Sequence, residues 1–321
     1  MKTRVRTPLG LPTVLIPLQI GQTHLRHLLS LTRLWGNHQL FGGIMATISI
    51  NGKLLDASQA KISAVDHGFV AGDGVFEALA VYDGTPFAID RHLNRLERSA
   101  TGMRMKKLPD RETLRASILD VVAANKISFG KVRVTFTTGD GPLGSDRLDS
   151  EPLTVVACAP LAPLAPSARV HVAPWPRNEH GVLSGIKTNS YAENVVGLDW
   201  AISQGSSEVI FKNIAGNLCE GSGSNIFLLL DGELITPTLA SGCLAGVTRD
   251  LIVEFLGGKE IDTPIESLTE HRFQEAFLSS SLRETQYIEA INGTIVATEP
   301  GPIATEISTR FKELIKDNLN P

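Results

Sequence analysis

Several features that direct a chain toward a particular protein class are scarce in this sequence of 321 residues. It has only three cysteines, Cys158, Cys219 and Cys243. Their odd number and spacing argue against a disulfide framework or a metal site and favour a reducing cytoplasm. An excess of positive charge is also missing. The formal net charge is -4, and the scattered lysines and arginines form no basic face that would bind nucleic acid. A small molecule is therefore the expected partner.

Residues 1–44 contain no aspartate or glutamate but hold five lysines or arginines. No apolar run in this segment is long enough for a membrane-spanning helix. Two interpretations stay open: a transit peptide, or an upstream start codon with the protein proper beginning at Met45. In both cases we expect a basic, disordered extension that carries no chemistry.

The remaining sequence predicts a mixed α/β (α+β) protein of two domains, since 42% apolar residues are enough to bury a sizeable core. A hairpin with the turn Asn51-Gly52 opens the first domain. A proline-spaced stretch later in the chain is typical of a semi-rigid connector. We expect a small α/β domain over residues 45–160, a linker over 161–167 and a larger, β-rich domain over 168–321.

Lys187 is the first candidate for chemistry. The sequence places it at the end of an expected strand, just before a helix that begins near Tyr191. Burial at such a position disfavours the ammonium form and lowers the pKa of the amine. A neutral amine can condense with an aldehyde.

Glu220 and the segment before residue 251 suggest a binding site around this lysine. Glu220 lies in an otherwise apolar run, where a carboxylate needs a cationic partner such as a protonated ring nitrogen. Gly246 and Thr248 stand at the start of a helix, where free amides can bind an anion. Alternatively, Thr248 is an ordinary N-terminal cap.

Two arginines occur where they can meet an anion. Asp90 is expected to cap a helix in which Arg95 lies one position from the apolar stripe, so that it either reaches inward toward an anion or is solvated. Strict alternation predicts a strand over residues 132–137. If its polar face lines a cleft, Arg133 binds a carboxylate there; if that face meets water, Arg133 has no such role.

Six motifs resemble those of the class IV aminotransferases, the fold-type IV pyridoxal phosphate enzymes. They are Phe76-Glu77, His92-x-x-Arg95-Leu96, Ile186-Lys187-Thr188, Glu220-Gly221-x-x-x-Asn225-Ile226-Phe227, Leu244-x-Gly246-Val247-Thr248-Arg249 and Ser279-Ser280-Ser281. The resemblance extends from Ala46 to about Asn292. The family includes branched-chain and D-amino-acid transaminases and aminodeoxychorismate lyase.

The resemblance implies pyridoxal 5'-phosphate as the cofactor and Lys187 as the catalytic residue that forms a Schiff base with it and then moves a proton. Glu220 would keep the pyridine nitrogen protonated. The other implied cofactor contacts are Arg95, Val247, Thr248 and Ser281 to the phosphate, and Tyr191 to the phenolic oxygen. The implied substrate contacts are Phe76, Arg133 and Leu282. No metal is expected.

The favoured reaction is transamination between an amino acid, branched-chain-like or D-, and a 2-oxo acid. Arg133 lies six residues before Gly139, as does the pocket arginine of branched-chain transaminases. Lyases tend to have a hydroxyl residue where this chain has Ala78, and a second arginine where residues 141–144 are Gly-Pro-Leu-Gly. The alternative is 4-amino-4-deoxychorismate lyase, which releases p-aminobenzoate and pyruvate. Residues 190–196, together with 219–221 and 241–246, resemble actinobacterial proteins of that name. A non-catalytic protein of the same fold is a minor alternative.

The resemblance also implies a homodimer, as is typical of the family. With the composition, it predicts a cytoplasmic enzyme that binds an amino acid and a 2-oxo acid, and neither nucleic acid nor membranes.

Overall fold

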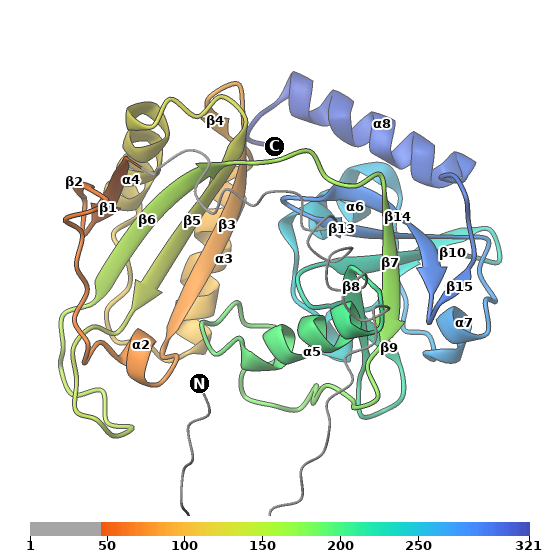
Figure 1. Ribbon diagram of the computed structural model, residues 1–321, viewed down its shortest axis with the longest axis horizontal. Coiled ribbons are helices and arrows are strands. Elements are labelled where there is room, and N and C mark those ends of the chain that lie inside the picture. The colour runs from red at the N-terminus through yellow and green to blue at the C-terminus, as the bar shows by residue number, and fades with distance from the viewer. Residues whose placement is uncertain (1–45) are drawn as a thin grey trace, which may run out of the picture. The chain divides into compact units, whose positions relative to one another are not determined.

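Two β-sheets organise the protein, whose computed structural model describes residues 46–321 (Figure 1). The expectations for residues 1–44 therefore lie outside the described residues. The first sheet has six antiparallel strands in the order β2-β1-β6-β5-β3-β4. They are β1 (Thr47–Ile50), β2 (Lys53–Asp56), β3 (Gly74–Tyr82), β4 (Thr85–Pro86), β5 (Gly130–Thr137) and β6 (Leu153–Pro160).

Three helices accompany this sheet: α2 (His67–Val70), α3 (Ile89–Gly102) and α4 (Arg111–Ala124). Both α3 and α4 pack against the sheet, because alternate residues of its central strands are apolar and buried. The core between them includes Val75, Leu79, Leu96, Ile118 and Val134.

The second sheet has nine strands, in the order β12-β11-β10-β13-β14-β7-β8-β9 with β15 paired to β14. Most pairs are antiparallel, but β7 is parallel to both β14 and β8. The strands are β7 (Ser167–Val172), β8 (Glu208–Lys212), β9 (Leu218–Gly221), β10 (Asn225–Leu230), β11 (Glu233–Thr236), β12 (Lys259–Glu260), β13 (Glu275–Ser280), β14 (Glu284–Ile291) and β15 (Thr294–Ile295).

Helices accompany the second sheet as well: α5 (Ala192–Ser203), η1 (Leu239–Ser241), α6 (Val247–Leu256), α7 (Glu266–Thr269) and α8 (Pro302–Asp317). One core cluster joins the sheet to α6 and α8. In it, Phe227 and Phe277 stack with their ring centroids 5.1 Å apart. A second cluster is built mainly from the strands themselves and includes Ile210, Ile226, Leu278 and Ile288.

The mixed α/β class is confirmed by these elements. The first sheet ends at Pro160 and the second begins at Ser167, so the change of sheet falls at the predicted linker. Residues 46–321 nevertheless belong to one compact unit, and the division into two domains stays a prediction.

One local prediction is confirmed. The turn Asn51-Gly52 joins β1 to β2, and both residues have positive φ, 49° and 80°, as a type I′ turn requires. The structure also shows that Asp110 caps α4 through the Thr113 N–H at 2.8 Å.

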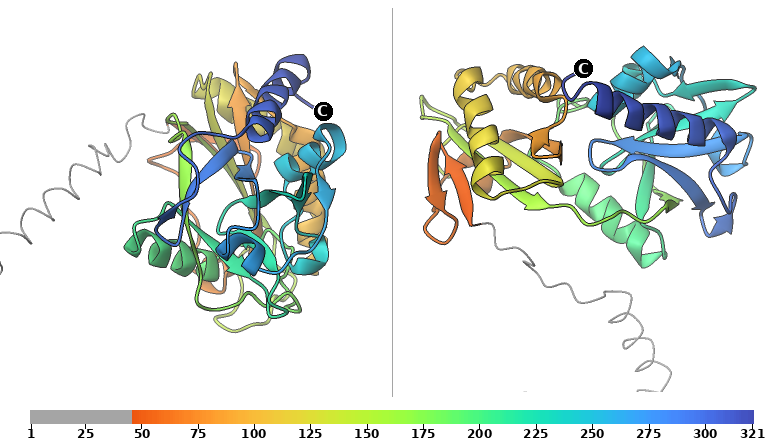
Figure 2. Two further views of the ribbon diagram at one scale, coloured as in Figure 1. Left: turned by 90° about the vertical axis from the view of Figure 1, so that its right-hand side faces the viewer. Right: turned by 90° about the horizontal axis from the view of Figure 1, so that it is seen from above.

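The prediction that Asp90 caps α3 is wrong. The N-cap is Ala88, whose backbone is left-handed with φ of 51°. The Ala88 N–H donates to the Leu319 carbonyl at 2.7 Å. This distant contact fixes the start of the helix two residues earlier than the local sequence indicates, and Figure 2 shows the C-terminus lying beside it.

Candidate active site

The segment that carries Lys187 is hydrogen-bonded to the edge of β3. The Phe76 N–H donates to the Lys187 carbonyl at 3.0 Å, and the Asn189 N–H donates to the Gly74 carbonyl at 2.8 Å. A Cβ on Gly74 would lie 2.8 Å from the Phe136 carbonyl oxygen of the neighbouring strand, so this position requires glycine. The lysine is thus held by the first sheet, although its sequence lies between strands of the second.

The predicted strand before Lys187 is wrong, because residues 182–185 form a turn and the segment takes its backbone partners from β3. The helix expected near Tyr191 is confirmed: α5 begins at Ala192.

The Lys187 amine lies beside an aromatic ring, with Nζ 4.3 Å from the centroid of Phe76. Burial, followed by repulsion from Arg95, lowers the pKa of Lys187 to about 8, while Glu77 and Glu220 oppose the shift. About a tenth of the amine is therefore neutral at pH 7. A neutral amine is the form that attacks a carbonyl carbon.

We expect the reactivity of Lys187 toward a small aldehyde to rise from pH 7 to pH 9 with a midpoint near 8, because only the unprotonated amine reacts. Reductive attachment of an aldehyde with cyanoborohydride, followed by peptide mass spectrometry, measures this midpoint. A lysine-containing peptide, with an ordinary pKa of about 10.4, serves as the reference. A midpoint for Lys187 near that of the peptide would contradict the prediction.

Glu220 lies on β9 and is buried, with 9% of its surface exposed. Its Oε2 accepts the Leu244 N–H at 3.0 Å, and its Oε1 accepts from the Arg177 guanidinium. Burial raises the pKa of Glu220, and the charge of Arg177 is the largest opposing influence. The cationic partner that the sequence analysis required for this carboxylate is present in the chain itself.

Arg177 is a site residue that the sequence analysis missed. Its Nε donates to Glu193 and its Nη2 to Asn194, each at 3.0 Å, and its guanidinium carbon lies 4.2 Å from the centroid of Phe211. It stands in an irregular segment after β7, where no periodicity marks it. The one available signal was the buried Glu220, which needed a cation from elsewhere in the sequence.

Arg95 is buried on α3, so the interpretation in which it is solvated is wrong. Its Nε and Nη2 donate to the Glu77 carboxylate, each at 2.7 Å, and its Nη1 donates to the Ala245 carbonyl at 3.0 Å. Because Ala245 precedes α6 by two residues, the guanidinium lies beside the N-terminus of that helix.

The N-terminus of α6 offers free amide donors. Gly246 is its N-cap and has no side chain to satisfy them, so the interpretation of Thr248 as the cap is wrong. A Cβ on Gly246 would lie 2.1 Å from Asn225 Oδ1, which explains the glycine. The first N–H groups of a helix lack intrahelical acceptors and favour an anion. Val247 and the buried Thr248 belong to this first turn.

Ser281 lies in the turn between β13 and β14, with its Oγ 3.4 Å from His92 Nε2 of α3. Leu282 follows it and is half-buried. The neighbouring Ser279 is fully buried, and among the described residues its hydroxyl has no hydrogen-bond partner.

Phe76 is the common neighbour of three predicted site residues. The Arg133 guanidinium carbon lies 3.9 Å from its centroid, although Arg133 itself is exposed. The Tyr191 ring meets Phe76 edge to face, with centroids 5.3 Å apart. The Tyr191 hydroxyl donates to the Ser222 carbonyl, and burial raises the pKa of Tyr191 to about 12. Lys187, Arg133 and Tyr191 therefore share one aromatic surface.

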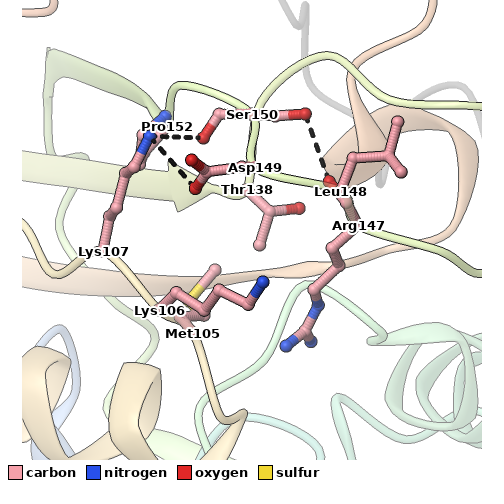
Figure 3. Close-up of a pocket in the computed structure, with 9 residues that line it drawn as sticks. All are labelled: Met105, Lys106, Lys107, Thr138, Arg147, Leu148, Asp149, Ser150 and Pro152. Atoms are coloured by element: carbon pink, nitrogen blue, oxygen red, sulfur yellow. Dashed lines mark hydrogen bonds and ion pairs between the residues drawn. The ribbon is translucent and has the colours of Figure 1, made fainter.

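A pocket lies beside the loop over residues 139–152 (Figure 3). Its basic side chains include two that are already paired. Lys107 contacts Asp149 at 3.5 Å, and Arg147 Nε donates to Asp73 at 2.7 Å. Arg147 also donates to the Met103 carbonyl at 2.7 Å. Arg147 therefore ties this loop to the start of β3.

Comparison with known proteins identifies the family. The family model described as amino-transferase class IV matches residues 74–291, which include every site residue described above. The chain belongs to the class IV aminotransferases.

Three relatives illustrate the range of this aminotransferase family. A "Putative branched-chain-amino-acid aminotransferase" of Methanocaldococcus jannaschii is 30% identical over 275 residues, covering 83% of this chain and 96% of the relative. A D-alanine aminotransferase of Listeria innocua is 29% identical, covering 84% and 96%. An aminodeoxychorismate lyase of Bacillus subtilis is 27% identical, covering 85% and 96%.

A solved structure agrees with the fold. The branched-chain aminotransferase of Thermoproteus uzoniensis, crystallised with norvaline, superimposes with a TM-score of 0.78 at 26% identity, covering 84% of this chain and 94% of that one. The fold-type IV prediction is confirmed, as are the prediction of an enzyme and that of pyridoxal 5'-phosphate as its cofactor.

The residues of this aminotransferase fit that cofactor. They combine an amine with a pKa of about 8, a buried carboxylate, a buried guanidinium and a helix N-terminus without a side-chain cap. Among residues 46–321, no group of three or more histidine, cysteine, aspartate or glutamate side chains could hold a metal ion. Every helix in that range is too short or too polar to cross a membrane.

Proposed function

We propose that this class IV aminotransferase transfers an amino group between an amino acid and a 2-oxo acid, with Lys187 as its covalent attachment point for the cofactor. One observation carries the proposal. Tyr191 packs against Phe76, which also contacts the Lys187 amine, and its hydroxyl donates to the Ser222 carbonyl two residues after Glu220; the charges of Lys187 and Glu220 accordingly influence each other's pKa. This pair suits a pyridine aldehyde, which needs an amine at its carbonyl and an acid at its nitrogen.

Each proposed role follows from the position of a side chain. The bound cofactor supplies an electron-withdrawing ring that stabilises negative charge on the substrate carbon. Lys187 binds the aldehyde and carries a proton to and from that carbon, which its lowered pKa permits. Glu220 holds a proton at the ring nitrogen. The Tyr191 hydroxyl, which remains protonated at neutral pH, would turn its proton from the Ser222 carbonyl to the phenolic oxygen of the cofactor.

The phosphate would be held from both sheets. Arg95 contributes the guanidinium from α3, and the first turn of α6 contributes the amides of Val247 and Thr248. The hydroxyls of Thr248 and Ser281 complete the proposed set.

Substrate binding is assigned to the surface around Phe76. The Arg133 guanidinium lies over this ring, and its Nε donates to the Thr135 hydroxyl at 3.3 Å; among residues 46–321 it has no ion pair to break before it binds a carboxylate. Phe76 and the half-buried Leu282 would bound the substrate side chain. Relatives named for branched-chain substrates and for D-alanine support a substrate that is a branched-chain-like or a D-amino acid.

Aminodeoxychorismate lyase is the second candidate, favoured by the Bacillus subtilis relative. The structure gives this activity less support. Ala78 offers no hydroxyl beside Arg133, with which it is paired across β3 and β5. Arg147, the arginine in the loop after Gly139, is engaged by Asp73.

Amino-acid substrates separate the two activities. We expect turnover of a branched-chain or D-amino acid only when a 2-oxo acid is added as amino acceptor, measured by chromatography of both products. Formation of pyruvate and p-aminobenzoate from aminodeoxychorismate without any added 2-oxo acid would show that the protein is a lyase.

In the same assay, Arg133→Ala should raise the Michaelis constant for the amino acid several-fold while the cofactor still binds. Loss of the cofactor would mean that Arg133 is structural.

We further propose a cytoplasmic homodimer. Large apolar side chains remain exposed on α2, on α5 and on the turn before Lys187; they include Phe69, Val182, Val195 and Val196. The Ser190 hydroxyl donates to the Gly72 carbonyl, which brings the segment after α2 next to the start of α5. A second copy would cover this apolar surface. Sedimentation at micromolar concentration tests the proposal, and a monomer would contradict it.

The cytoplasmic location is supported by the three unpaired cysteines, which suit a reducing compartment.

A further inference from the structure

Glu77 is a buried carboxylate with three charge-assisted hydrogen bonds. It lies on β3 with 1% of its surface exposed. Its oxygens accept from Arg95 Nε, Arg95 Nη2 and His92 Nδ1, each at 2.7 Å. A carboxylate withdrawn from water in this way persists only because its partners compensate it. The bidentate contact also fixes the plane of the guanidinium.

We propose that Glu77 and His92 are positioning residues, which hold Arg95 and Ser281 in place for the phosphate of the cofactor before it binds. This inference rests on the proposed role of Arg95 and adds two residues to it. Neither is expected to touch the reacting atoms.

The donors of Arg95 support this arrangement. A guanidinium has five N–H bonds. Two are directed to Glu77, and one is directed to the Ala245 carbonyl at 3.0 Å. The two that remain belong to Nη1 and Nη2. Because Ala245 lies just before α6, the guanidinium is already beside the free amides of that helix.

His92 extends the arrangement to Ser281. Burial is the largest influence on His92 and lowers its pKa, so the ring is neutral. With Nδ1 donating to Glu77, Nε2 must accept from the Ser281 hydroxyl. This contact is long, at 3.4 Å, and therefore weak. The hydroxyl proton is free to turn from His92 to a phosphate oxygen, while the oxygen of Ser281 stays close to α3.

The charge of Glu77 and its orienting role predict opposite changes in phosphate affinity when the charge is removed. Its negative charge repels a phosphate, so removal of the charge should tighten phosphate binding if Coulomb interactions dominate. If Glu77 acts by orienting Arg95, removal of the charge should weaken phosphate binding. The long Arg95 side chain would then no longer be held in place and would have to be ordered on binding. The dense hydrogen bonding around Glu77 favours the second outcome.

The test compares two aldehydes that differ only in the phosphate. We expect Glu77→Gln to weaken the affinity for pyridoxal 5'-phosphate at least 10-fold, while the affinity for pyridoxal changes less than about twofold. Fluorescence titration of the cofactor-free protein measures both affinities. Inorganic phosphate should compete less well against pyridoxal 5'-phosphate in the variant. Glu284→Gln is the matched control, because it removes a carboxylate that accepts the Tyr82 hydroxyl and, among residues 46–321, makes no hydrogen bond with Arg95.

Unchanged or tighter binding of pyridoxal 5'-phosphate by Glu77→Gln would overturn the inference. An equal loss for both aldehydes would also overturn it, because Glu77 would then be purely structural. Circular dichroism checks the fold. If the glutamine variant does not fold, Glu77→Asp replaces it: this variant retains the charge but shortens the side chain, and it should show the same phosphate-specific loss. If the unaltered protein binds neither aldehyde, the proposed function itself fails.

Discussion

Replacement of Lys187 by alanine is expected to lower turnover at least about 1,000-fold, because the variant loses both the covalent attachment and the proton carrier. The position of the Lys187 amine is fixed by its neighbours. Its backbone is hydrogen-bonded to β3, and its Nζ lies 4.3 Å from the centroid of Phe76.

Two quantities are measured: the turnover rate and the covalent labelling of Lys187. Borohydride reduction in the presence of pyridoxal 5'-phosphate should label one peptide in the unaltered protein, the one that contains Lys187, and none in Lys187→Ala. The control is Lys131→Ala, since Lys131 is exposed on β5 and should be dispensable. Labelling of a different lysine in the unaltered protein would refute the assignment.

The second large effect is expected at Arg177, where replacement by methionine should destabilise the protein by about 3 kcal/mol, the range for breaking a buried ion pair from one side. Arg177 is 8% exposed and contacts Glu220 and Glu193. Without it, the Glu220 charge is left in a buried site where it is already unfavourable. For a protein of this size, the melting temperature should fall by about 5 °C.

A double variant separates lost charge compensation from lost packing. Arg177→Met combined with Glu220→Gln should recover much of the stability, because the unpaired charge is then absent. The control is Arg169→Met, which breaks an exposed pair with Glu289 and should change the melting temperature little. If the double variant is as unstable as the sum of the single ones, Arg177 acts mainly through its contact with Phe211.

Sequence patterns predicted the elements whose causes are local. The turn Asn51-Gly52 depends on two residues that are adjacent in the sequence, and it is present. Residues whose chemistry is unusual for their position were also visible, as with Glu220 in an apolar strand. What could not be predicted was the partner of each. Arg177 and Glu220 are 43 residues apart, and no local sequence pattern indicates that they pair.

The two wrong boundaries have the same origin. Ala88 begins α3 because a carbonyl near the C-terminus accepts its N–H, and the Lys187 segment is irregular because β3 supplies its backbone partners. In both places a contact between distant segments overrides the local preference. Periodicity reports only the residues within one element.

The hydrogen bonds of residues 187–189 to the edge of β3 also mean that cleavage between the two sheets would divide the site between two fragments. A fragment that ends within residues 161–167 would keep the first sheet but lose the segment hydrogen-bonded to Gly74 and Phe76, and the complementary fragment would carry the amine without its support. Mixing the two fragments should restore aldehyde labelling only when they reassociate. The amide protons of Phe76 and Asn189 should then regain slow exchange together.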